Sequence, residues 1–423
     1  MSNKPSLSAR RQFLRQISTS ALALPLSGFA SNFSNLPALP SLETPDEAYW
    51  ELVKKQFNVP PNAIMANSAN LCPSPLFVVE KVRQYMEDLS RDVSFQNRDK
   101  YNKIRETTLK GLANFLEVEA NEVGITRNTS ESNNILVNGL DLDPGDEVLV
   151  WEQNHPTNKL AWHQRAKRDG FAVKEISVPQ NPSTAQALVA PFQHAMTANT
   201  RLISFSHISN VSGIRMPAQV LCSMAREAGV LSMVDGAQSL GNLKLNLKEI
   251  GCDFYTASTH KWLMGPMENG ILYVRTNPKL MLWPDSIAAG WDAEKLSVDK
   301  KYCVLGQRND PSTAAISDIL TFHEQIGKQH IEDRIQQLST RLRKALSERI
   351  PQIQFTTPED TSFTGGVLIF NIPGQDFRQI FQTLYEDFHI ACAPMEGIRL
   401  SPTIVSTLED MDRLAEAVQQ ATA

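Results

Sequence analysis

Short apolar runs alternate with amphipathic segments through the middle of the chain, and this alternation restricts the fold more than any other feature. The runs predict strands at Glu147–Trp151, Ala172–Val178, Leu202–Ser206, Leu231–Asp235, Phe254–Ser258 and Gly270–Val274. Apolar residues at helical spacing predict helices between the first four strands, near Lys159–Asp169, Gln186–Met196 and Pro217–Ala228. Strands linked through helices pair in parallel and are covered on both faces. We therefore expect an α/β protein whose mostly parallel sheet is wrapped by helices.

The two flanks of this central stretch have other patterns. Upstream, helical spacing predicts helices at Pro75–Leu89, Asn102–Leu116 and Ser130–Gly139. After Pro311 the chain changes to long helices and separated strands, at Ala314–Gly327, Ile331–Arg349, Gly366–Asn371, Ile390–Ala393 and Leu408–Gln420. Because 423 residues exceed what one hydrophobic core usually serves, we expect two domains. The large domain is predicted at 44–305, with an N-terminal segment touching a smaller α+β domain at 306–423.

Composition and charge restrict the class of protein without naming a function. Hydrophobic residues make up 42% of the chain and charged residues 21%, which is ordinary for a soluble globular enzyme. The formal net charge of −5 argues against nucleic acid as a partner. The five cysteines are odd in number and widely spaced, and none forms a Cys-x-x-Cys pair near histidines. Neither a disulfide framework nor a metal site is therefore expected.

The first thirty residues hold four cations and no acidic residue. Two adjacent arginines, Arg10 and Arg11, precede a mildly apolar stretch and the small-x-small sequence Gly28-Phe29-Ala30. This segment resembles a twin-arginine export signal, and the alternative is a basic N-terminus without such a role. The resemblance implies contact with the twin-arginine translocase, a removed signal at 1–30, a flexible linker at 31–43 and a periplasmic mature protein. The apolar stretch is too short and too weakly apolar for a stable membrane anchor.

A carboxylate and a lysine follow two of the predicted strands. Asp235 ends the strand Leu231–Asp235, and Lys261 follows the strand Phe254–Ser258, so both are expected at the edge where open α/β sheets bind ligands. This pair suits pyridoxal 5′-phosphate (PLP): the lysine amine forms an imine with the cofactor, and the carboxylate keeps the pyridine nitrogen protonated. Lys261 must then be partly neutral, which desolvation and nearby positive charge favour. The alternative is a strand-terminal Asp with an unrelated surface Lys.

The sequence around these two residues resembles the class V aminotransferase family of fold-type I PLP enzymes, and the resemblance extends from about Met65 to Leu414. Asp235-Gly236-Ala237-Gln238 is similar to the family's pyridine-nitrogen motif, and Ser258-Thr259-His260-Lys261-Trp262-Leu263 to its Schiff-base motif. The His-Lys-Trp-Leu wording resembles the isopenicillin N epimerase-like branch. The resemblance implies a PLP Schiff base on Lys261, with Asp235 as the partner of the pyridine nitrogen.

The same resemblance implies further cofactor contacts. Arg127-Asn128-Thr129-Ser130-Glu131 precedes a helix, so Thr129, Ser130 and their backbone amides would hold the phosphate at a positive helix end, although this wording is also an ordinary N-cap signature. The remaining cofactor residues implied are Ser258 and His260 at the phosphate, Asn210 and Gln238 near the phenolic oxygen, and His155 against the ring. A polar role behind the ring is the alternative for His155.

Two segments resemble the family's substrate-binding parts. Gly397-Ile398-Arg399-Leu400-Ser401-Pro402 matches the carboxylate-binding segment, in which Arg399 would hold an α-carboxylate through two parallel hydrogen bonds. A surface arginine is the plainer alternative. Early in the chain, Asn67 and Asn70 lie where the family's N-terminal segment lines the substrate site.

The chain also departs from its relatives. Where they often carry a Gly-Thr whose threonine reaches the partner subunit's phosphate, this chain has Gly306-Gln307, so that contact is open although a homodimer is expected from the resemblance. Cysteine desulfurases need a nucleophilic cysteine on a loop well before the terminal arginine. Cys392 instead stands seven residues before Arg399 in an apparent apolar strand, which favours a packed core thiol.

The expected chemistry starts when the substrate amine replaces Lys261 on the cofactor and the released lysine acts as base at Cα. We expect transamination or epimerisation through this external aldimine, on an amino acid or on an amino-acid residue within a secreted peptide metabolite. The alternatives are a cysteine desulfurase or carbon–sulfur lyase, and an exported binding protein that keeps the fold without turnover.

Overall fold

A seven-stranded sheet forms the centre of the molecule. The computed structural model describes residues 39–40, 42–276, 282–289, 291 and 297–422, so the predicted signal at 1–30 lies outside the described residues. The strand order is β2-β8-β7-β6-β5-β3-β4, and only β8 runs antiparallel to its neighbours. The mostly parallel α/β sheet is therefore confirmed. Its strands are β2 (Val123–Thr126), β3 (Glu147–Trp151), β4 (Ala172–Ile176), β5 (Thr200–Ser206), β6 (Leu231–Asp235), β7 (Phe254–Ser258) and β8 (Gly270–Val274).

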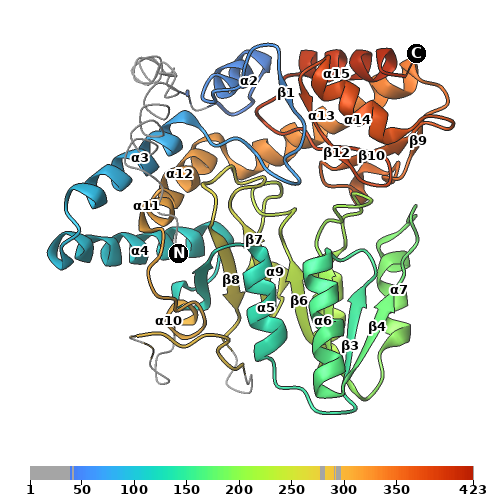
Figure 1. Cartoon of the computed structure of the whole chain (residues 1–423). Helices are drawn as coiled ribbons and strands as arrows, with labels where there is room; N and C mark the ends of the chain where they lie inside the picture. The colour runs from blue at the N-terminus through green and yellow to red at the C-terminus, as the bar shows by residue number, and fades with distance from the viewer. Residues whose placement is uncertain (1–38, 41, 277–281, 290, 292–296, 423) are drawn as a thin grey trace, which may run out of the picture. The chain divides into compact units, whose positions relative to one another are not determined.

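Helices cover this sheet, and the parallel strands β6 and β7 at its centre are buried along almost their whole length. Helices α5 and α6 lie on the face turned to the viewer in Figure 1, whereas the buried residues of α7 share another apolar cluster with those of α8. Ile135 and Leu136 of α5 share one apolar cluster with Trp162 of α6 and Met233 of β6. The helices that follow the strands are α5 (Thr129–Gly139), α6 (Pro156–Asp169), α7 (Ala185–Ala195), α8 (Ala218–Glu227) and α9 (Leu247–Ile250), with a 3₁₀ turn, η3 (Ala120–Glu122), before β2.

A second group of helices lies beside the sheet. It comprises α3 (Leu76–Arg91), α4 (Phe95–Leu116), α10 (Val298–Tyr302), α11 (Asp310–Ala314) and α12 (Ile316–Ile326). The helix predicted as Ala314–Gly327 starts two residues later, because the chain bends at Ala315 between α11 and α12. Helix α3 packs against α11, and α4 packs against α11 and α12, so the N-terminal helices contact the segment that follows Asn309.

The C-terminal part has its own sheet and apolar core. Four short strands pair antiparallel in the order β12-β13-β10-β9, and helices α13, α14 and α15 pack with them. Leu39–Ala423 forms one compact unit, so the predicted boundary at 305/306 stays a prediction. The elements are α13 (Lys328–Arg349), β9 (Gln354–Phe355), η4 (Thr361–Phe363), β10 (Leu368–Asn371), α14 (Phe377–Glu386), β11 (Ile390–Ala391), β12 (Ala393–Pro394), β13 (Ile398–Leu400) and α15 (Leu408–Gln420).

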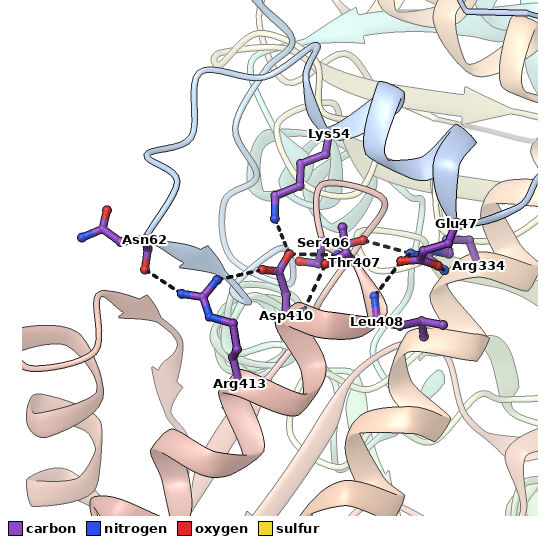
Figure 2. Close-up of polar contacts among 9 residues, drawn as sticks. All are labelled: Glu47, Lys54, Asn62, Arg334, Ser406, Thr407, Leu408, Asp410 and Arg413. Carbon is purple, nitrogen blue, oxygen red and sulfur yellow. Dashed lines mark hydrogen bonds and ion pairs between the residues drawn. The ribbon is translucent and has the colours of Figure 1, made fainter.

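The N-terminal segment is fastened to this C-terminal part before it reaches the large sheet (Figure 2). Helix α2 (Glu47–Lys54) contributes both ends of the attachment: Glu47 forms two hydrogen bonds of 2.8 Å with the buried guanidinium of Arg334, and Lys54 lies 2.6 Å from Asp410. Glu47 also accepts a hydrogen bond from the first amide of α15, that of Leu408. Strand β1 (Ile64–Met65) then pairs with β11, which brings the following residues to the edge of the cavity described below.

Candidate active site

Strands β6 and β7 end side by side, and their ends carry Asp235 and Lys261 to one cavity. The strands pair in parallel with Asp235 opposite Thr256, and Lys261 follows three residues after the end of β7. The cavity has a volume of about 230 Å³. Besides Asp235 and Lys261, its lining comprises Asn128, Thr129, Ser130, His155, Thr157, Ser206, Ile208, Asn210, Ala237, Gln238, Ser258 and His260.

The carboxylate of Asp235 is buried and held from two sides. Only 3% of the residue is exposed. The backbone amide of Ala237 donates to Oδ1 at 3.1 Å, and Nδ2 of Asn133 donates to Oδ2 at 3.0 Å. The turn after the strand leaves no space for a side chain, because a Cβ atom on Gly236 would lie 1.9 Å from Cζ of Tyr255. This tight turn and the two donors give the carboxylate one fixed direction.

Lys261 has the opposite character, since no described residue accepts a hydrogen bond or ion pair from its amine. Burial lowers the pKa of Lys261 to about 8; the negative charge of Asp235 opposes this shift, and the positive charge of Arg399 adds to it. About a tenth of the amine is therefore neutral at pH 7, far more than for a lysine with its ordinary pKa. A neutral, unpaired amine can attack an aldehyde, which is the property that an imine-forming lysine needs.

Hydroxyl groups gather at one end of the cavity, where α5 begins. Asn128 caps the helix by accepting from the amide of Glu131, so the hydroxyls of Thr129 and Ser130 are left to line the cavity. Oγ of Ser258 accepts from the amide of Thr129 at 2.8 Å and lies 2.6 Å from its hydroxyl. Hydroxyls and amides at the positive end of a helix suit a phosphate.

The two histidines that line the cavity are kept neutral by their surroundings. Burial and then the charge of Lys261 lower the pKa of His260 to about 4. The pKa of His155 is also lowered, first by burial and then by Lys261. His155 caps α6, and its Nδ1 accepts from the amide of Thr157 at 3.3 Å, which leaves Nε2 as the protonated nitrogen. Both residues therefore offer the cavity a neutral ring rather than a cation.

The two residues predicted to contact the phenolic oxygen of PLP differ in whether their side chains already form hydrogen bonds. Asn210 lines the cavity, and no described residue hydrogen-bonds with its side-chain amide. Gln238 also lines the cavity, but its Nε2 donates to the carbonyl oxygen of Ala69 at 2.9 Å and its Oε1 accepts from Trp262 at 2.7 Å. Gln238 thus joins the N-terminal segment to the lysine loop, with one N–H left for a ligand.

The predicted substrate residues are only partly brought together. Nη2 of Arg399, on β13, donates to Oδ1 of Asn67 at 3.3 Å, and Nη1 donates to the carbonyl oxygen of Asn210 at 3.2 Å. Burial lowers the pKa of Arg399 to about 10, and its Nε has no partner within the described residues. Asn70 is exposed and is not part of the cavity lining. Arg399 and Asn67 therefore stand next to the cavity, whereas a substrate contact of Asn70 stays a prediction.

The sequence left the roles of Cys392 and Gln307 open, and the structure shows the surroundings of both. Cys392 is 5% exposed in the C-terminal apolar core, and burial raises the pKa of its thiol to about 12 even though Arg399 is nearby. Cys72, Cys222, Cys252 and Cys303 are buried as well, with raised pKa values. Gln307 is exposed and accepts a hydrogen bond from Arg98 of α4 at 2.7 Å.

Sequence reasoning missed Asn133, which donates to the Asp235 carboxylate, and Thr256, which donates to Asn133. Two signals pointed to them. Asn133 stands four residues after Thr129, which places it on the same face of α5. Thr256 stands two residues before Ser258, which places it on the same face of β7.

The residues of this cavity fit PLP. Hydroxyls at the helix end suit the phosphate, a fixed carboxylate suits the pyridine nitrogen, and an unpaired amine suits the aldehyde. When bound, PLP supplies a ring that withdraws electrons from a substrate carbon. The protein's part is to hold the ring, place a base beside it and grip the substrate.

Comparisons with known proteins agree with this reading. The model of the aminotransferase class-V family matches residues 66–413. Isopenicillin N epimerase of Streptomyces clavuligerus is 26% identical over 89% of this chain and 99% of its own, and a probable cysteine desulfurase of Pyrococcus abyssi is 26% identical over 82% and 90%. The solved cysteine desulfurase of Thermococcus onnurineus NA1 shares the fold, with a TM-score of 0.78 at 23% identity over 88% of this chain and 97% of that one. The chain belongs to the aminotransferase class-V family of PLP-dependent enzymes.

Proposed function

We propose that this enzyme acts at Cα of an amino acid, or of an amino-acid residue in a secreted peptide metabolite, by transamination or epimerisation. The observation that carries the proposal is the placement of an unpaired Lys261 amine between the charges of Asp235 and Arg399. Arg399 would fix the substrate carboxylate, and Lys261 would remove the Cα proton. The similarity to isopenicillin N epimerases along nearly their whole length supports this choice.

The test is to incubate the holoenzyme with amino acids and amino-acid-containing peptides in D₂O. Deuterium at Cα with inverted configuration means epimerisation, and transfer of the amine to a keto acid means transamination. Free amino acids and peptides run in parallel show which substrate class is accepted. Absence of deuterium uptake from every substrate would contradict the proposal.

A carbon–sulfur lyase is the second candidate, because cysteine desulfurases are among the similar proteins. A desulfurase transfers sulfur to a reactive thiolate, and every cysteine of this chain is buried with its pKa raised. A lyase that eliminates sulfur without its own thiol meets no such obstacle. Sulfide release from cysteine or cystine, measured beside the deuterium assay, separates the two candidates.

We propose that the enzyme is exported by the twin-arginine route and works in the periplasm. The support is the Arg10-Arg11 pair followed by an apolar stretch and Gly28-Phe29-Ala30. None of the helices that the structure describes is long and apolar enough to cross a bilayer. The test expresses the full chain with Arg10 and Arg11 both changed to Lys: the periplasmic fraction should be lost, and unchanged distribution would contradict the export proposal.

We also propose that the enzyme is a homodimer in which a second copy covers the outer side of α3. That helix buries only Leu76 and Val78, whereas Val79 and Met86, together with Phe95 at the start of α4, remain exposed; Phe95 is 84% exposed. Figure 1 shows α3 and α4 beside each other at the margin of the described unit. Uncovered apolar groups of this kind mark interaction surfaces. Phe95→Glu should give a monomer in sedimentation, and an unchanged mass would exclude this surface.

A further inference from the structure

Asn133 and Thr256 form a buried polar pair behind the Asp235 carboxylate. We propose that they are positioning residues of the cofactor site, which hold the Asp235 carboxylate in the direction that the pyridine nitrogen requires. The inference uses the PLP assignment and does not depend on which Cα reaction the enzyme performs.

The three side chains form one chain of hydrogen bonds. Oγ1 of Thr256 donates to Oδ1 of Asn133 at 2.6 Å, and Nδ2 of Asn133 donates to Oδ2 of Asp235 at 3.0 Å. The hydroxyl of Thr256 can donate only to the amide oxygen of Asn133, because the amide nitrogen is not an acceptor. The amide nitrogen of Asn133 is therefore the end that faces Asp235. The amide of Ala237 holds the other carboxylate oxygen. Both oxygens of Asp235 are thus oriented before any ligand arrives.

Burial makes this arrangement more than incidental packing. Asn133 and Thr256 are completely buried, and Ile135 and Leu136, which follow Asn133 on α5, are apolar core residues. A buried amide or hydroxyl costs free energy unless it is hydrogen-bonded, and a leucine or valine of similar volume would avoid that cost. The polar pair is therefore best explained by what it does for the charge next to it. Donors to a carboxylate stabilise its charged form.

A consequence follows for the proton on the pyridine nitrogen. A carboxylate that is fixed and anionic keeps that nitrogen protonated, and its positive charge makes the nearby imine lose its proton more easily. The groups that act on the imine position are Asp235, Arg399 and the two neutral histidines, His155 and His260. Without the Asn133 donor, the pyridine nitrogen carries less positive charge, and the imine keeps its proton to a higher pH.

The experiment measures the visible absorbance of the PLP-loaded protein, without borohydride treatment, as a function of pH. Asn133→Leu removes the donor at nearly constant volume and should raise the midpoint by about one pH unit, the shift that corresponds to one hydrogen bond to a charged group. The dissociation constant of PLP should rise about tenfold in parallel. Thr256→Val should shift the midpoint in the same direction by less, and Thr256→Ser, which keeps the hydroxyl, should restore it.

A matched control separates positioning from packing. Thr108→Val removes another buried hydroxyl contact, that with Ser317, on α4 and away from the cavity. It should lower the melting temperature without moving the midpoint. If Asn133→Leu lowers the melting temperature but leaves the midpoint and PLP affinity at their wild-type values, the proposal is wrong. Should Asn133→Leu not fold, the Thr256→Val and Thr256→Ser pair decides, since equal midpoints in these two variants would also overturn it.

Discussion

The two sides of the cavity are built in opposite ways. On the cofactor side, polar groups already hold one another: Asn133 donates to Asp235, and Ser258 contacts Thr129. On the substrate side, Arg399 meets Asn67 from 332 residues away through one hydrogen bond of 3.3 Å, and its Nε has no partner within the described residues. The groups around Asp235 and the start of α5 are paired without a ligand, whereas Arg399 keeps a donor free.

This contrast indicates how the work of the enzyme is divided. Paired and buried groups on the cofactor side hold the ring in one position and act in the same way on every substrate. Free donors on the substrate side decide how the substrate is oriented, and hence which bond at Cα faces the ring. Changes on the cofactor side should therefore lower kcat, and changes on the substrate side should mainly raise KM.

The largest effect is expected for Asp235→Asn on the cofactor side. Asparagine keeps the shape and the contact with the Ala237 amide but removes the charge that maintains the protonated pyridine nitrogen. We expect kcat to fall about a thousandfold with little change in KM, as when one preorganised electrostatic contact is removed. Steady-state kinetics measure both constants, and Asp333→Asn on the exposed side of α13 serves as the control. A raised KM with normal kcat in Asp235→Asn would contradict the proposal that the cofactor side determines kcat.

Arg399→Ala should have the next largest effect, on the substrate side. The loss of a two-hydrogen-bond grip on a carboxylate should lower kcat/KM about a hundredfold, mostly through KM. The visible absorbance of the bound cofactor should persist, because Arg399 is not part of the cavity lining. Arg341→Ala, which breaks an exposed ion pair with Asp412, is the matched control. Equal kinetics in the Arg399 and Arg341 variants would remove Arg399 from substrate binding.

A smaller effect should appear in the pH dependence of cofactor capture by the apoenzyme. Only the neutral Lys261 amine reacts, so the rate should rise tenfold per pH unit up to about pH 8, the lowered pKa of Lys261, and level off above it. Asp235 on the cofactor side raises the pKa of Lys261, and Arg399 on the substrate side lowers it. Arg399→Ala should move the profile to higher pH and Asp235→Asn to lower pH. Shifts of the same sign in both variants, measured by stopped-flow absorbance, would contradict the electrostatic account.

The smallest effect is expected for Cys392→Ala. The thiol is buried in the C-terminal core with a raised pKa, so it should contribute packing but no chemistry. Turnover should stay within about twofold of wild type, a difference of less than about 0.5 kcal/mol in activation free energy. A loss of sulfide release from cysteine in this variant would instead favour the desulfurase alternative.

The sequence was most informative where function follows directly from a strand end. Asp235 is the last residue of β6, and Lys261 follows β7. The predicted strand ends and the sequence motifs of the family therefore both placed these residues at one cavity. The Gln238 contact with Ala69 and the attachment of α2 to Arg334 could not be predicted. Each joins segments more than a hundred residues apart, and local patterns carry no information about such pairing. The resemblance placed Asn67 and Asn70 at the substrate site; Asn67 lies beside Arg399, and the contact of the exposed Asn70 stays a prediction.

The most direct test of the whole account is to find where the cofactor is attached. The purified holoenzyme is reduced with borohydride and digested, and the peptides are sequenced by mass spectrometry. The account predicts a single phosphopyridoxyl group on Lys261. A group on another lysine, or a reduced protein without one, would contradict it.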